Sequence, residues 1–123
     1  MSKDLWIAQN LLPGEQYAGI LLGADGAQDH HLILLAPAAA LITWDAAIKW
    51  AQKVGGSLPT RKEQALLFAN LPAAFECAWY WSDAQYAGYE SYAWAQLFGN
   101  GFQDGFRKGC KLRARAVRRL TIQ

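Results

Sequence analysis

Leu58-Pro59-Thr60-Arg61, with Glu63 two positions later, opens the part of the chain that decides the fold. Pro59 fixes the backbone before a helix, and Thr60 with Glu63 forms a capping box that satisfies backbone donors at the helix start. The sequence therefore predicts a helix that runs from this point to about Asn70.

After residue 72 the hydrophobic pattern changes from a helical period to the period of two that is typical of strands. Residues 78–82 form one strand, with Trp79 and Trp81 on one face and Tyr80 on the other. A second strand covers residues 91–98, a glycine turn leads into a short third strand, and a final strand covers residues 111–120. The final strand is expected to alternate between an inward and a solvent-facing set: Leu112, Ala114 and Ala116 inward, and Lys111, Arg113 and Arg115 outward.

The first half of the chain predicts a hairpin followed by a helix. Residues 17–22 and 31–35 are strand-like runs around Asp25-Gly26, a pair that supplies the positive φ angles of a tight turn. Thr43 is a good N-cap for an amphipathic helix that ends at Gly55-Gly56. We expect residues 1–15 to be a variable lead-in, residues 36–40 to be a short connector, and residues 16–123 to form a single domain.

The composition is globular, with 53% hydrophobic and 18% charged residues. Aromatic residues exceed what a small core needs, so some of them should be exposed. The chain start has no basic flank followed by an apolar run, so we expect no signal peptide and no membrane insertion. The tryptophans assigned to the core are Trp44, Trp79, Trp81 and Trp94.

Positive charge is concentrated at the end of the chain, although the formal net charge is only +2. Seven of the twelve Lys and Arg residues follow Phe106, and no acidic residue follows Asp104. This pattern fits an anionic partner, but it also fits a strand whose arginines pair with acids such as Glu63, Glu76 or Asp83. The expected basic surface consists of Arg107, Lys111, Arg113 and Arg115.

Neither the cysteines nor the histidines form a recognisable site. Cys77 and Cys110 lack CxxC spacing, so we expect two buried free thiols, with a disulfide as the alternative. His30 and His31 are adjacent and should point to opposite faces at the surface edge of the hairpin. No serine lies in a Gly-x-Ser-x-Gly turn, and we expect no enzymatic activity, no metal and no cofactor.

Four segments, in this order, resemble the DUF1566 domain family: residues 58–63, residues 79–82, Ala93-Trp94 with Phe98 and Gly101, and residues 113–119. That family is similar to the C-terminal domain of Legionella collagen-like adhesins and is common in tailed phages and prophages. The resemblance covers about residues 40–120. It implies an α+β, C-type-lectin-like fold in which two helices pack on a twisted antiparallel sheet with a long loop region.

The resemblance also implies a non-enzymatic binding module, a phage or prophage structural protein of the tail or receptor-binding apparatus, made in the host cytoplasm and carried in the virion. Its partner would be a virion subunit, a host-surface component or a second copy of the chain. Two alternatives stay open: an accessory protein that inhibits a host factor, and a nucleic-acid-binding module that uses the basic strand. A glycan ligand stays open too, but not through calcium, because Trp81-Ser82-Asp83 lacks the accompanying proline motif of calcium-binding lectins.

The residues expected to contact a ligand lie on loops that the resemblance places at one end of the sheet. Tyrosine supplies large, rigid and amphipathic contact area in such loops, as it does in antibody paratopes. The expected ligand-binding residues are Tyr86, Tyr89, Tyr92, Asn100, Gln103 and Asp104.

Overall fold

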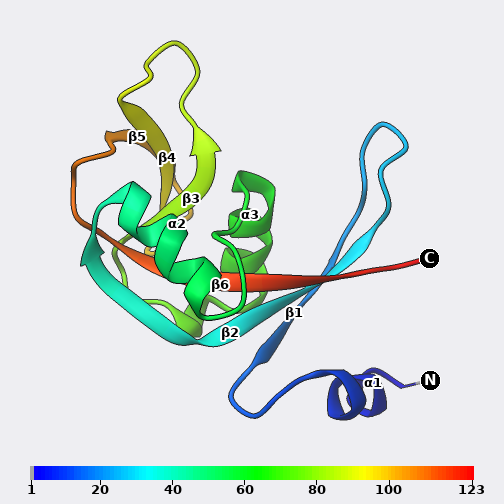
Figure 1. Ribbon diagram of the computed structural model, residues 1–123. Coiled ribbons are helices and arrows are strands. Elements are labelled where there is room, and N and C mark those ends of the chain that lie inside the picture. The colour runs from blue at the N-terminus through cyan, green and yellow to red at the C-terminus, as the bar shows by residue number, and fades with distance from the viewer. Residues whose placement is uncertain (1) are drawn as a thin grey trace.

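The computed structural model describes residues 2–123, which form a mixed α+β structure with an open six-stranded sheet (Figure 1). The helices are α1 (Lys3–Asn10), α2 (Trp44–Lys53), α3 (Arg61–Asn70) and the short 3-10 helix η1 (Pro72–Ala74). The strands are β1 (Gln16–Leu21), β2 (His30–Ile42), β3 (Trp79–Gln85), β4 (Tyr92–Leu97), β5 (Gln103–Arg107) and β6 (Leu112–Thr121).

The strands follow the order β1-β2-β6-β3-β4-β5, so the last strand of the chain lies in the middle of the sheet. β1 and β2 form the predicted hairpin around Asp25-Gly26, and both turn residues have positive φ angles. The expectation of a wholly antiparallel sheet is wrong at one pair, because β3 runs parallel to β6 and joins it at Tyr80 and Arg113. Within residues 2–123 this is the only residue pair between β3 and β6. It alone joins strands β1, β2 and β6 to strands β3, β4 and β5 in the sheet.

Helices α2 and α3 cover opposite faces of the sheet. Trp81 packs in the core beneath α2, whereas its neighbour Tyr80 packs in the core beneath α3. On β6, Ala116 and Val117 divide between the two cores in the same way, as the alternation of strand side chains requires. The predicted separation of Trp79 and Trp81 from Tyr80 is thereby confirmed.

Both predicted helix starts are confirmed. Thr43 Oγ1 accepts the N–H of Ala46 at 3.4 Å, and α2 stops before Gly55-Gly56. Thr60 Oγ1 accepts the N–H of Glu63 at 3.1 Å, while the Glu63 carboxylate accepts the N–H of Thr60 at 2.8 Å. This reciprocal capping box fixes the point at which α3 begins.

Two segments are more ordered than the sequence predicted. Residues 3–10 of the expected lead-in form α1, whose Trp6 ring lies 4.1 Å from the ring of His31. Residues 36–40, expected to be a connector, continue β2. The pairing of β2 with β6 shifts register between Leu34 and Ala38, and this irregularity accommodates Pro37, which has no N–H to donate to a ladder.

The cysteines differ from expectation in their exposure. Both are free thiols, but Cys77 and Cys110 are exposed rather than buried. Each lies in a connection that leads into a strand, not in the strand itself. Connections run over the surface of a domain, so the apolar strands beside them do not bury these side chains.

Candidate ligand-binding surface

The loop that joins β3 to β4 carries two tyrosines, Tyr86 and Tyr89, whose rings pack against each other and against Tyr92 at the start of β4. The ring centroids of Tyr86 and Tyr89 lie 6.0 Å apart, those of Tyr86 and Tyr92 lie 6.1 Å apart, and those of Tyr89 and Tyr92 lie 5.5 Å apart. We call these three residues the tyrosine cluster. The loop projects beyond the sheet at the top of Figure 1, and Tyr89 is 61% exposed.

A single glutamine side chain holds the tyrosine loop in place. The Gln85 amide nitrogen lies 3.1, 2.8 and 2.9 Å from the carbonyl oxygens of Tyr86, Tyr89 and Tyr92, to which it donates. Gly88 supplies the positive φ angle, 87°, that the turn between these tyrosines requires. The loop is therefore preorganised, which lowers the entropy lost when its rings contact a ligand.

Tyr86 is held from below by the sheet. A Cβ atom at Gly105 would lie 2.2 Å from the Tyr86 ring, so glycine at this position of β5 lets the ring lie directly on the backbone. The Tyr86 ring also packs against Trp94 on β4, with centroids 4.6 Å apart and planes inclined by 32°. Trp94 is half-buried and belongs to neither hydrophobic core, contrary to its expected place in the core.

The tyrosine cluster and Trp94 together form what we call the aromatic surface. Arg61, the first residue of α3, extends it. The guanidinium carbon of Arg61 lies 3.4 Å from the centroid of the Trp94 ring, the geometry of a cation–π contact. Arg61 Nε donates to Gln103 Oε1 at 2.9 Å, and the Gln103 amide donates back to the carbonyl of Arg61 at 2.9 Å. On the other side, the guanidinium of Arg107 lies 5.6 Å from the Tyr92 ring. The capping box thus positions one of two arginines that flank the aromatic rings.

The structure brings together only part of the predicted ligand-binding set. Gln103 lies beside Arg61 at the edge of the aromatic surface. Asn100 lies in the β4–β5 turn, at the opposite end of β4 from the tyrosine cluster, where its side chain accepts the N–H of Phe102. Asp104 alternates with Gln103 along β5 and so points to the other face of the sheet. The expectation that all six residues gather at one end of the sheet is wrong for Asn100 and Asp104, and also for Gln103, which pairs with Gln96 toward the β4–β5 turn, whereas Tyr92 pairs with Arg107 at the other end.

The predicted basic surface is only partly a surface. Arg107 and Lys111 are exposed and Arg113 is half-buried, but Arg115 is only 8% exposed. The outward assignment of Arg115 is wrong because α3 and η1 cover the second face of the sheet, so neither face of β6 at this point is open to water.

The last two arginines of β6 pair with carboxylates, the arrangement left open as the alternative to an anionic partner. Arg118 Nη2 lies 2.7 Å from Glu15, and Arg119 Nε lies 2.6 Å from Glu63. Each carboxylate raises the pKa of its arginine. Two of the four arginines of β6 are therefore neutralised within the protein, which weighs against a nucleic-acid surface at this end of β6.

Glu63 is the centre of a buried polar network. Its side chain is fully buried, accepts two hydrogen bonds from Arg119, and lies 2.7 Å from His30 Nε2. Burial raises the pKa of Glu63, but the hydrogen bonds from Arg119, Thr60 and His30 lower it by more, and the net direction is downward. The network ties the hairpin, α3 and β6 together. The side chain of His31 points the other way, and its Nδ1 forms a hydrogen bond with the Tyr17 hydroxyl.

Residues 2–123 contain no group of three or more His, Cys, Asp or Glu side chains placed to hold a metal ion. No helix in this part of the chain is long and apolar enough to cross a membrane.

The chain matches no model of a known protein family and no curated protein sequence. The resemblance to DUF1566 domains therefore stays a prediction, and the residues themselves carry the functional argument.

Two members of the aromatic surface, Trp94 and Arg61, were not predicted from the sequence. A signal for Trp94 was present, because Ala93 and Ala95 alternate with it and are fully buried beneath α2. Small residues on one face of a strand leave the large residue between them to the opposite face. Nothing in the local sequence signals Arg61, whose contact with Trp94 depends on how α3 lies over the sheet.

Proposed function

We propose that this protein is a non-enzymatic binding module that contacts its partner with the tyrosine cluster, flanked by Arg61 and Arg107. The observation that supports this proposal is that Gln85 holds the backbone of all three tyrosines, and Gly105 lets the Tyr86 ring lie on β5, before any partner arrives. Tyrosine and arginine are the residues enriched where partners bind strongly, since they combine a large contact area with polar ends.

A protein surface is the partner that this chemistry favours. Aromatic rings and guanidinium groups can stack on the side chains of a partner, while the tyrosine hydroxyls can hydrogen-bond at the rim of the contact. A glycan would use the same ring faces without calcium.

We further propose that the fold is C-type-lectin-like and that the protein belongs to the tail or receptor-binding apparatus of a phage or prophage. Support for the fold comes from two helices, α2 and α3, that pack on a sheet in which the final strand lies in the middle. Support for the tail comes from the resemblance to DUF1566 domains alone. Mass spectrometry of purified virions tests it: absence of the chain from particles would end the tail assignment and favour an accessory role in the host.

The binding surface is tested by comparing three immobilised forms of the protein as baits in quantitative pull-downs. Tyr89→Ser removes the most exposed ring of the cluster, and Leu22→Ser removes a side chain that is 73% exposed and directly follows β1 in the other hairpin. A partner of the tyrosine cluster should be retained by the wild type and by Leu22→Ser, and lost with Tyr89→Ser. Equal retention by all three forms would refute the assignment of this surface.

A further inference from the structure

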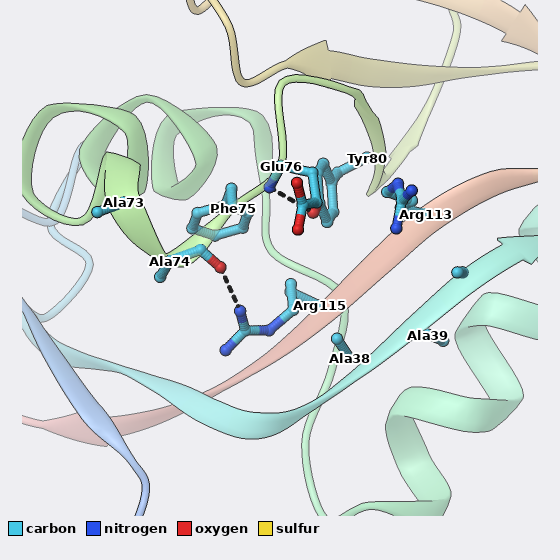
Figure 2. Close-up of a pocket in the computed structure, with 10 residues that line it drawn as sticks. Ala38, Ala39, Ala73, Ala74, Phe75, Glu76, Tyr80, Arg113 and Arg115 are labelled. Carbon is cyan, nitrogen blue, oxygen red and sulfur yellow. Dashed lines mark hydrogen bonds between the residues drawn. The ribbon is translucent and has the colours of Figure 1, made fainter.

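A small pocket lies between the irregular part of β2 and η1, away from the tyrosine cluster. Its volume is about 190 Å³. The walls combine alanines with two aromatic rings, and three charged side chains reach the pocket (Figure 2). The charged and aromatic residues of the lining are Phe75, Glu76, Tyr80, Arg113 and Arg115.

Arg115 is buried in this pocket without a counter-ion. Its Nη1 donates to the carbonyl of Ala74 at 2.6 Å and its Nη2 to the carbonyl of Leu35 at 2.8 Å, but its Nε has no hydrogen-bond partner. Within residues 2–123 no carboxylate lies within 4.0 Å of the Arg115 guanidinium. The ring of Phe75, 5.4 Å away, offers only a weak cation–π contact in exchange.

The neighbouring arginines show what is missing at Arg115. Arg118 and Arg119 lie on the same strand, and each has a carboxylate partner that raises its pKa. Burial instead lowers the pKa of Arg115, because no anion compensates the loss of water around its charge. A buried charge without a partner is costly, so an occupant that supplies the negative charge would stabilise the folded protein.

The irregular pairing of β2 with β6 creates the space. Ladder pairs are interrupted between Leu34 and Ala38, which frees the Leu35 carbonyl to accept from Arg115. Beyond this point only small alanines line the β2 side of the pocket. Figure 2 shows the guanidinium of Arg115 pointing toward η1, and Arg113 rising from the same strand beside Tyr80.

We propose that this pocket binds a small monocarboxylate, which compensates the charges of the Arg113 and Arg115 guanidinium groups that line it. Two guanidinium groups and the Glu76 carboxylate give the lining a formal charge of one positive unit, which a monoanion neutralises. The Phe75 and Tyr80 rings and the alanines offer apolar walls to a short alkyl chain. A carboxylate suits the site because guanidinium groups bind planar oxyanions through short, charge-assisted hydrogen bonds.

Nitrogen-15 NMR of arginine side chains gives a direct readout, because the Nε–H resonance of Arg115 responds to a charge placed beside its guanidinium group. Propionate is titrated into labelled protein, and chloride is titrated separately at matched ionic strength. The Arg115 Nε–H resonance, assigned by its loss in Arg115→Met, should shift saturably with propionate, while the resonances of Arg118 and Arg119 stay in place. A saturable shift with chloride alone would overturn the assignment to a carboxylate, and an equal drift of all three resonances would overturn the site.

Two further variants keep the test decisive if Arg115→Met does not fold. Ala38→Leu fills the pocket from an exposed position of β2 while Arg115 stays in place, so the propionate shift should disappear. Ala24→Leu makes the same change in the exposed β1–β2 turn and should leave the shift intact. Retention of a saturable shift in Ala38→Leu would refute the proposed pocket.

Glu76→Gln tests the charge of the pocket lining. It removes the competing negative charge and should strengthen propionate binding several-fold; unchanged or weaker binding would contradict the charge argument.

Discussion

Replacing Glu63 with glutamine tests the buried ion pair that ties α3 to β6. The Glu63 side chain has no solvent exposure, and its two oxygens accept from Arg119 at 2.6 and 2.7 Å. Glutamine has nearly the same size and keeps an oxygen that can accept the N–H of Thr60. The substitution therefore removes the negative charge and leaves the capping box and the packing in place.

The expected loss of stability in Glu63→Gln follows from the environment of Glu63 and Arg119. Removing one partner of a buried ion pair costs about 3–5 kcal/mol, because the other charge is left uncompensated. The Arg119 side chain is 30% exposed and can recover part of its hydration, so we expect the lower end of that range, about 3 kcal/mol. For a domain of this size the corresponding fall in Tm is roughly 10 °C.

The same carboxylate should make stability depend on pH. The pKa of Glu63 in the folded protein lies below its ordinary value of 4.5, despite the opposing effect of burial. A carboxyl group with a lowered folded pKa stabilises the folded state above its unfolded pKa, and this stabilisation is lost as the pH falls through the folded pKa. The gap in stability between wild type and Glu63→Gln should therefore be complete at pH 7 and shrink as the pH is lowered below the ordinary value.

Urea unfolding followed by tryptophan fluorescence measures this gap. Glu15→Gln is the matched control, because it removes the partner of Arg118 in the connection between α1 and β1. That connection can open without the cores, so the control should cost only about 1 kcal/mol. A loss below about 0.5 kcal/mol for Glu63→Gln, within the range of ordinary surface changes, would refute the reasoning. A gap that stays constant as the pH falls would refute the pKa argument.

Three further outcomes are expected. Gly105→Ala should push the Tyr86 ring off β5, cost about 1–3 kcal/mol of stability, and shift the Tyr86 ring resonances in NMR spectra; unchanged resonances would contradict the close approach. Arg61→Met should cost about 0.5–1 kcal/mol in urea unfolding and change the fluorescence of Trp94, whereas an unaltered spectrum would count against the cation–π contact. Both exposed cysteines should react with a thiol reagent in the native protein, and reaction only after unfolding would show that they are buried.

Local signals predicted most of the elements correctly. The capping box at Thr60 and Glu63, the Asp25-Gly26 turn and the alternation around Trp81 each act over a few residues, so they can be read without knowledge of the partners of a segment. The order of the strands in the sheet does not follow from such local signals. The parallel contact of β3 with β6 depends on where α3 and η1 lead the chain, and no short stretch specifies it.

The same difference between local signals and long-range contacts explains why Arg115 was wrongly assigned to the solvent-facing side of β6. Alternation correctly places Ala114 and Ala116 on the opposite face from Arg115. What alternation cannot reveal is whether the second face of the strand meets water or another layer, since both arrangements have the same period. A charged residue in the pattern normally indicates water, and here the covering layer instead supplies backbone carbonyls to the guanidinium.

Both candidate sites lie on the α3 side of the sheet, and one continuous segment of chain borders them. α3 begins at Arg61, which stacks on Trp94 beside the tyrosine cluster, and leads into η1, whose Ala74 carbonyl holds Arg115. The α2 side, in contrast, is a closed apolar core. Because one face provides a complete core, the other face can hold aromatic, polar and charged groups at the two ends of α3, and these are the groups that form the two proposed binding sites.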